Sequence, residues 1–308
     1  MLKVTNAHNA FLVQDSFDYD RVVVDSISYA TANILAGNRE DSPAIEVLNG
    51  YIEFSSSKPA LMAVTGLASI IVNNKKEKPW QLIPIAPNSK VRIETLGSSV
   101  AYISFPQGIS HLGGRRQIKT GFTIDVHEKR ILELLDELPA RRIPSHCIPT
   151  SLRKVEISAE LLLDEKGKLP KLFVIRDKNP HGISMTPIGN LALSLSRIPD
   201  VDPKIGSMVV SNPDVHVIAN PNSANSPIIA EIGPLSLGAL ARAPDNAIVK
   251  VNYSRDSEIK SKEIVREVEL IDRIKAIITN ARNALQRGAK LVRVKIKEKI
   301  FEVWVEEA

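Results

Sequence analysis

The chain of 308 residues contains a single cysteine, Cys147, so no disulfide can form within it. We interpret Cys147 as a small buried apolar residue. A catalytic thiolate would need a positioned base, and the adjacent His146 would point to the opposite face of a strand. Aromatic residues make up 5% of the sequence, too few for a base-stacking surface. No apolar run approaches the ~20 residues that cross a bilayer.

Short motifs of common active sites are also missing. The sequence has no GxxxxGK[ST] loop, no GxGxxG after a strand and no GxSxG nucleophile turn. Its six histidines are scattered, and none forms the helical i, i+4 pair that binds zinc. We therefore expect no metal cluster.

Charge is plentiful and nearly balanced. The sequence contains forty basic and thirty-five acidic residues, which gives a net charge of +5 and a pI of about 9.2. Between Arg255 and Glu307 the signs alternate, which is typical of a solvated, ion-paired face rather than a phosphate-binding stripe. We expect neither a nucleic-acid nor a membrane partner. The first residues lack a basic segment followed by an apolar one, which favours the cytoplasm.

The pattern of elements predicts a mainly β protein. Residues 1–125 form a first β domain of short strands, interrupted by a helix from Ser26 to Ala36 with Ser26 as N-cap and Gly37 just after its end. Turn signals such as Asn49-Gly50 separate the strands.

The rest of the chain divides into three parts. Residues 126–150 form a helix that ends at Pro139 and a Pro-rich linker, and residues 151–256 form a second β domain with a short helix near Leu235 to Arg242. Residues 257–308 form a long helix that ends at Gly288 and a terminal hairpin. The apolar face of the long helix is expected to pack on the β core, with partner binding as the alternative.

Two segments could contribute to a chemical site. The run from Gln14 to Asp25 holds four aspartates and Arg21, and carboxylates this dense can shift one another's pKa and act as acid or base. A solvated acidic loop is the simpler interpretation. Gly113-Gly114-Arg115-Arg116 offers backbone N–H groups and positive charge to an anion, or is a basic surface turn.

A series of segments in the first 110 residues resembles a known family. In chain order they are Gln14-Asp15, Asp25 at the head of a helix ending Ala32-Asn33-Ile34-Leu35-Ala36-Gly37-Asn38, Ala44-Ile45-Glu46, Gly50 to Phe54, Ala63 to Gly66, Trp80, Ala101-Tyr102-Ile103 and Gly108-Ile109. The series is similar to allophanate hydrolase subunit 2, the C-terminal carboxyltransferase half of urea carboxylase, and the C component of 5-oxoprolinase. A weaker resemblance covers roughly Pro199 to Tyr253.

The resemblance implies two cyclophilin-like β-barrel domains and a role beside a partner resembling allophanate hydrolase subunit 1 or the B component of 5-oxoprolinase. Such a complex acts on a small amide or lactam with ATP. The implied catalytic residues are Asp15, Arg21 and Asp25, and the implied substrate-binding residues are Gln14, Asn33, Glu46 and Thr65. Glu46 either orients groups of the site or is a buried acid tied to the helix end.

Departures from the family pattern leave other functions open. The Gly/Pro-rich loop before the first helix is shortened, the acid of the family's Thr-Gly-Ala-Asp is Ala68, and a glycine-rich loop of the second half is replaced. A non-catalytic scaffold or regulatory paralogue that binds the same partner is therefore the main alternative. A stand-alone biotin-dependent carboxyltransferase is a third, although the chain has no biotin-carrier lysine motif and so no covalent biotin of its own.

Overall fold

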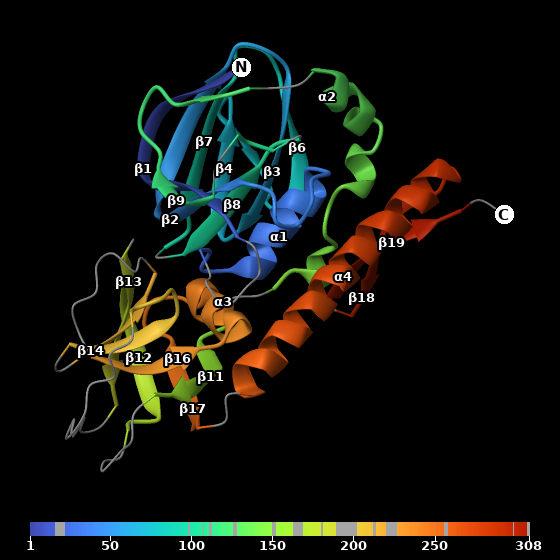
Figure 1. Cartoon of the computed structure of the whole chain (residues 1–308). Helices are drawn as coiled ribbons and strands as arrows, with labels where there is room; N and C mark the ends of the chain where they lie inside the picture. Colours follow the sequence, from blue (N-terminus) through green and yellow to red (C-terminus); the bar gives the residue numbers. More distant parts are fainter. Residues whose placement is uncertain are drawn as a thin grey trace.

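The computed structural model describes residues 1–15, 22–97, 99–106, 108–110, 113–125, 128–149, 152–162, 169–179, 181–188, 202–211, 214–219, 227–255, 258–297 and 299–306. Mainly β structure is confirmed, with two barrel-like sheets, a long C-terminal helix and a terminal hairpin (Figure 1). The predicted boundaries of the four parts stay a prediction.

The first sheet has ten strands, which pair antiparallel in the order β5-β4-β7-β2-β8-β3-β6, with β1 paired to β2, β9 and β10. The strands are β1 (Leu2–Gln14), β2 (Ala44–Ser56), β3 (Ala60–Gly66), β4 (Ala68–Val72), β5 (Lys75–Glu77), β6 (Gln81–Ile85), β7 (Lys90–Thr95), β8 (Val100–Ser104), β9 (Gly114–Gln117) and β10 (Thr123–Ile124).

The predicted turn at Asn49-Gly50 is wrong, because β2 runs straight through both residues. The register between β1 and β2 shifts beside them, and Asn49 adopts a left-handed φ of 47°. A Cβ at Gly50 would lie 2.1 Å from the carbonyl oxygen of His8. Asn-Gly serves a bulge as well as a hairpin turn, since both need a left-handed residue and a close backbone approach.

The second sheet is a closed barrel in the order β11-β16-β14-β15-β13-β12-β17, and parallel pairing of β11 with β17 closes it. Its strands are β11 (Lys154–Leu161), β12 (Leu172–Asn179), β13 (Gly182–Pro187), β14 (Ser207–Ser211), β15 (Asp214–Ile218), β16 (Ile228–Ile232) and β17 (Ile248–Ser254). Helix α3 (Pro234–Arg242) lies between β16 and β17 in the chain.

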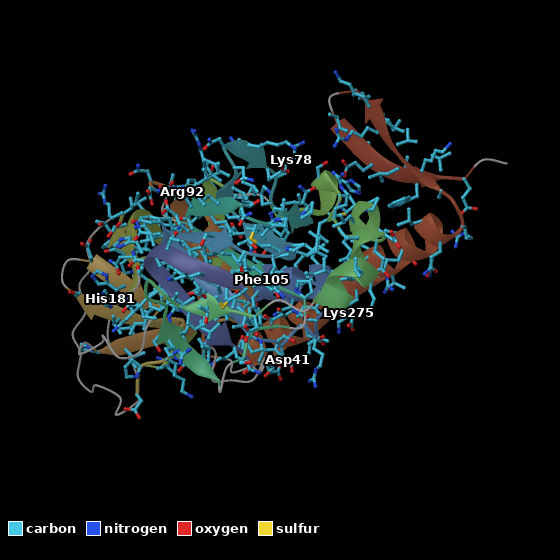
Figure 2. The ribbon with its side chains drawn as sticks, turned by 90° about the horizontal axis from the view of Figure 1, so that it is seen from above. Asp41, Lys78, Arg92, Phe105, His181 and Lys275 are labelled. Carbon is cyan, nitrogen blue, oxygen red and sulfur yellow. The ribbon has the colours of Figure 1, made fainter. Side chains whose placement is uncertain are left out.

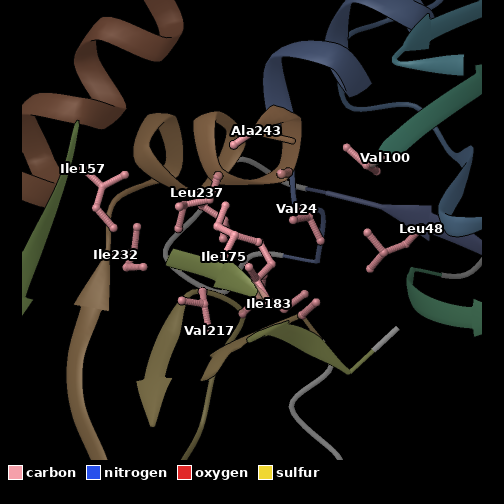
Figure 3. Close-up of a cluster of buried hydrophobic side chains, with 14 of the residues drawn as sticks. Val24, Leu48, Val100, Ile157, Ile175, Ile183, Val217, Ile232, Leu237 and Ala243 are labelled. Atoms are coloured by element: carbon pink, nitrogen blue, oxygen red, sulfur yellow. The ribbon is translucent and has the colours of Figure 1, made fainter. Parts of the chain in front are cut away.

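One hydrophobic cluster joins the two sheets. Val24, Leu48 and Val100 from the first unit lie in the same buried cluster as Ile175 of the barrel and Leu237 of α3 (Figure 3). Burial of such side chains contributes about 1.5–3 kcal/mol each. The two units are therefore held to each other by a continuous core.

Helix α1 (Ser26–Leu35) is buried along its whole length. Its N-cap is Asp25 rather than the predicted Ser26, because the Asp25 side chain accepts a hydrogen bond from the Ser28 N–H at 3.3 Å. Gly37 follows the C-cap with a φ of 78°, as predicted.

Helix α2 (Glu128–Leu135) confirms the helix predicted before Pro139, and α4 (Glu258–Gln286) confirms the long one. The apolar face of α4 packs on α1 and α3 (Figure 1). Ile271 and Ile278 of α4 are buried with Ile27 and Ile34 of α1, so the expected contact with the β core is made chiefly through these helices. None of the described helices is long and apolar enough to span a membrane.

The hairpin of β18 (Lys290–Ile296) and β19 (Lys299–Val305) is a separate two-stranded sheet. Two short 3-10 turns, η1 (Leu138–Ala140) and η2 (Ser145–Cys147), lie between α2 and the barrel. Cys147 is exposed, which corrects the expectation of a buried apolar residue. The segment forms a surface turn rather than a strand with one inward face.

Candidate functional site

Five buried or nearly buried side chains form a polar cluster between the two units, which we call the carboxylate network. They are Asp25 at the start of α1, Glu46 on β2, Tyr102 on β8, Arg115 on β9 and Arg242 on α3. Glu46 and Tyr102 are direct partners in the β2–β8 pairing, so the sheet register places their side chains on one face. Asp25, Glu46 and Tyr102 are each 0% exposed.

The Tyr102 hydroxyl is the centre of the carboxylate network. It accepts hydrogen bonds from the backbone N–H groups of Val24 at 3.1 Å and Asp25 at 2.9 Å, and donates to Glu46 Oε2 at 2.7 Å. Burial, together with the charges of Glu46 and Asp25, raises the pKa of Tyr102 well above its ordinary value. The phenol therefore stays neutral and fixes the turn that enters α1.

Glu46 is a buried acid tied to the beginning of α1. Its Oε1 lies 2.5 Å from Arg115 Nη1, and its Oε2 accepts from the Val24 N–H at 3.3 Å. The Arg115 guanidinium also lies over the Phe11 ring, 4.2 Å from its centroid. Gly114 to Arg116 belong to strand β9, so the predicted basic surface turn is wrong. The Arg115 side chain is only 9% exposed, and Glu46 pairs with its charge.

Asp25 links α1 to α3. Its Oδ1 lies 2.6 Å from Arg242 Nη1, and its Oδ2 accepts from the Ser28 hydroxyl at 2.6 Å. Gly238 lets the helices come this close, because a Cβ there would lie 2.9 Å from Asp25 Oδ1 and 3.2 Å from Arg242 Nη1. The carboxylate thus acts at once as a helix cap and as an ion-pair partner across the units.

The other two predicted catalytic residues are placed differently. Asp15 is 0% exposed, its backbone N–H donates to the Tyr29 hydroxyl at 3.1 Å, and its Oδ1 accepts from the Val22 N–H at 3.4 Å. A solvated acidic loop is therefore wrong for Asp15 and Asp25. Arg21 lies outside the described residues.

Three of the four predicted substrate-binding residues, Asn33, Glu46 and Thr65, are buried within the first unit. Asn33 Nδ2 donates to the Ser42 carbonyl at 2.7 Å, and its Oδ1 accepts from the Ser104 hydroxyl at 2.6 Å. The Thr65 hydroxyl donates to the Ser28 carbonyl at 2.6 Å.

Gln14, the fourth, is partly exposed at the end of β1, where it pairs with Gly114. The structure brings Asp25 and Glu46 together through Tyr102, while Asn33 and Thr65 fix the ends of α1 and its following loop.

The contacts of the carboxylate network hold the start of α1 in place rather than presenting a reactive group to a substrate. A general acid or base must come within hydrogen-bond reach of its substrate. The carboxylate oxygens of Asp25 and Glu46 instead contact donors of the protein itself, and each carboxylate pairs with an arginine. Among the described residues, no group of three or more His, Cys, Asp or Glu side chains could hold a metal ion. The catalytic and binding roles of the seven residues stay predictions.

Sequence reasoning missed Tyr102 and Arg242 as members of the site. Tyr102 lies inside the Ala101-Tyr102-Ile103 segment of the resemblance, so attention to its hydroxyl would have found it. Arg242 is 217 residues from Asp25, and no local pattern marks it.

The fold and the network define a mainly β protein in which two barrel-like sheets meet at a buried, charge-neutralised polar cluster. Residues 23–151 match the model of the carboxyltransferase domain, subdomains A and B. The chain is therefore similar to that family over these residues. This confirms the resemblance drawn from the first 110 residues.

Solved structures share the fold at low sequence identity. Urea amidolyase of Kluyveromyces lactis matches with a TM-score of 0.66 and 16% identity over 89% of this chain, and urea carboxylase of the same organism with 0.64 and 16% over 89%. The chain spans only 20% and 29% of those two proteins. The structure of TTHA0988 matches with a TM-score of 0.58 and 15% identity, over 82% of this chain and 99% of that one. No curated protein sequence matches this chain.

Proposed function

We propose that this chain works within a heteromeric complex of the 5-oxoprolinase or allophanate hydrolase type. The complex acts on a small amide or lactam with ATP, and in it the chain binds a partner like allophanate hydrolase subunit 1 or the B component of 5-oxoprolinase. The observation that carries the proposal is the carboxyltransferase-domain match over residues 23–151, which contains four of the five members of the carboxylate network. Two proteins of similar fold are named for urea, itself a small amide.

In this proposal the reaction takes place at the start of α1. Asp15 and Asp25 act as acid or base, and Arg21 holds a carboxylate of the substrate bidentately. Gln14, Asn33, Glu46 and Thr65 complete the substrate-binding set. Because Asp25 is fully buried in the isolated chain, this role requires that partner binding opens the contact between α1 and α3.

A second candidate function is a non-catalytic scaffold within the same complex. The observation that favours it is that Asp25 and Glu46 are 0% exposed and that each pairs with an arginine. A carboxylate held this way stabilises the chain but does not transfer a proton to a substrate. The scaffold would present the partner with a frame fixed by the carboxylate network.

One experiment separates the two candidates. The chain is purified with its native partners, and the recovered complex is assayed for ATP-dependent turnover of 5-oxoproline and of urea derivatives. Asp25→Asn is compared with Asp41→Asn, which changes a surface pair between Arg39 and Asp41 at 2.8 Å. Loss of turnover by Asp25→Asn in an intact complex supports catalysis, and full turnover supports the scaffold. Recovery of no partner by the wild-type chain would contradict both.

A further inference from the structure

The two faces of the terminal hairpin differ in what covers them. Strand pairing sets Val292 opposite Val303, so the alternation of side chains places five apolar residues on one face. We call this set the apolar hairpin face; its members, each between 38% and 57% exposed, are Val292, Val294, Ile296, Val303 and Val305. Figure 2 shows the hairpin projecting from the rest of the molecule beyond the end of α4. The apolar hairpin face is therefore open to solvent.

The opposite face of the hairpin packs toward the body of the protein. Glu302 on this face accepts from Arg142 Nη2 at 2.7 Å and from Arg293 Nε at 3.1 Å, and its side chain is 5% exposed. With Ile300, these residues line a groove of about 240 Å³ between the hairpin and the segment after α2. Strand β19 also contacts η2 and α4. These contacts hold the hairpin with its apolar face outward.

Strand β18 is an open edge of this two-stranded sheet. Among the described residues its sole strand partner is β19, and residues 291–296 make no other backbone hydrogen bond there. In an antiparallel pair only alternate residues bond to the neighbouring strand, so the others direct N–H and C=O groups to the open side. Every residue of β18 except Leu291 is exposed. A third strand can therefore reach this edge, and three strands are more stable than an isolated hairpin.

The charge of β18 selects among the strands that could pair with it. The strand contains Lys290, Arg293 and Lys295 and no acid, and Lys297 follows in the turn. Lys295 and Lys297 are exposed and form no ion pair with the acids that the structure describes. A second copy of β18 would bring basic side chains of both chains to one edge, where like charges are destabilising. An acidic strand would instead gain ion pairs along this edge.

We propose that β18 binds an extended segment of another protein in which acidic and apolar residues alternate. The segment adds as a third strand, and its backbone bonds to the open edge. Its apolar side chains extend the apolar hairpin face, and its acids on the other face lie beside Lys295 and Arg293, whose side chain is 58% exposed. In such strand addition the main-chain bonds give affinity and the alternate side chains give specificity. The surface shares no residue with the carboxylate network, so the inference goes beyond the proposed function.

Titration of the full chain with the peptide acetyl-EVEVEVE-amide, which has the seven-residue length of β18, tests the proposal. We expect saturable binding and slower hydrogen exchange of the backbone amides of residues 290–296. A peptide with lysine in place of each glutamate, and acetyl-EEVVVEE-amide, which has the same composition without alternation, should each bind at least ~10-fold more weakly. No saturation up to ~1 mM, equal affinity for the grouped peptide, or unchanged exchange in β18 would overturn the proposal.

Two exposed strand lysines supply matched variants. Lys295→Glu should weaken binding of the alternating acidic peptide ~3-fold or more, because one attraction becomes a repulsion. Lys154→Glu should leave binding unchanged, since β11 is paired on both sides and offers no open edge. Equal losses from the two variants would show a diffuse charge effect and refute the site.

Two further measurements identify other occupants of the apolar hairpin face. Sedimentation of the chain without peptide should show no dimer that depends on the hairpin, and a dimer that Val294→Lys separates would assign the face to a second copy. Binding to vesicles of phosphatidylserine and phosphatidylcholine that Val294→Lys abolishes would assign it to a lipid surface. Either result would overturn the proposal. Because all of these measurements use the chain alone, their outcome is independent of turnover by the complex.

Discussion

Asp25 and Arg242 form a buried ion pair, with 2.6 Å between Oδ1 and Nη1, although 217 residues separate them in the sequence. The pair joins the N-terminus of α1 to the last turn of α3 and so connects the first sheet to the barrel. Breaking a buried pair on one side is costly because the remaining charge stays buried. The pair is therefore a sensitive point for the stability of the whole chain.

Asp25→Ala should lower the free energy of unfolding by about 3–5 kcal/mol, because Arg242 loses its partner and α1 loses its cap. Asp25→Ser keeps a side-chain acceptor for the Ser28 N–H and should recover about 1 kcal/mol of that loss. Urea denaturation of the two variants measures the difference. Adding Arg242→Met to Asp25→Ser should cost less than the sum of the single changes, and strict additivity would argue against the pair.

Gly238→Ala should destabilise the protein by about 1–3 kcal/mol, although alanine favours helices more than glycine does. Its Cβ would lie 2.9 Å from Asp25 Oδ1, so α3 would have to move away from α1. In an Asp25→Ser background the contact is relieved, and Gly238→Ala should become neutral or stabilising. Thermal unfolding of the four proteins of this cycle checks the prediction, and an unchanged cost in the Ser background would contradict it.

Tyr102→Phe should cost about 1–3 kcal/mol of unfolding free energy, because the Asp25 N–H and Glu46 Oε2 lose a buried partner while the ring stays in place. Tyr51→Phe is the matched control, since its ring lies partly exposed against Arg92. That control should change stability by less than ~0.5 kcal/mol. Guanidinium denaturation of both variants gives the comparison, and similar costs would indicate that Tyr102 contributes only through its ring.

The buried Lys178 should make the free energy of unfolding depend on pH in the alkaline range. Burial lowers the pKa of this lysine from 10.5 to about 8, while Asp245 opposes the shift. Between these values the unfolded chain binds a proton that the folded chain does not, so stability rises as pH increases from about 8 to 10.5. The gain is at most about 3 kcal/mol.

Lys178→Met is the comparison that isolates this effect. The variant has no side chain titrating at this position, so the difference in unfolding free energy between wild type and variant should change across the same pH range, in favour of the wild type as pH rises. Urea denaturation at several pH values measures it. Parallel curves for the two proteins would show that Lys178 keeps its ordinary pKa in the folded state.

Local patterns were enough to predict most of the elements. Strand alternation, the apolar spacing of α4 and the glycine after α1 depend on neighbours a few residues away, and the structure confirms them. Two of the errors occurred where one sequence signal suits two conformations. Asn49-Gly50 suits a bulge as well as a turn, and Asp25 and Ser26 are both good N-caps.

The candidate site was predicted only in part. The sequence pointed to Asp25 and Glu46 through the matched segments, but it assigned Arg115 to a surface turn or an anion site and left Arg242 unmarked. Hydrogen bonds of the site join residues 56 to 217 positions apart. They depend on how the sheets and helices pack together, and a short stretch of sequence carries no information about that packing. Burial then decides whether a carboxylate is a reactive group or a structural one.

By itself, the sequence indicated the resemblance to the carboxyltransferase-domain family, the mainly β class and the order of the elements, because periodicity, turn residues and motif segments are local properties. Only the tertiary structure decided that Asp15, Asp25, Asn33, Glu46 and Thr65 are buried, that Arg115 and Arg242 neutralise Glu46 and Asp25, and that the hairpin and the segment after α2 enclose a groove. The physical reason is that charge pairing and burial arise from the packing of distant segments, which the hydrophobic core brings together and the sequence order does not specify.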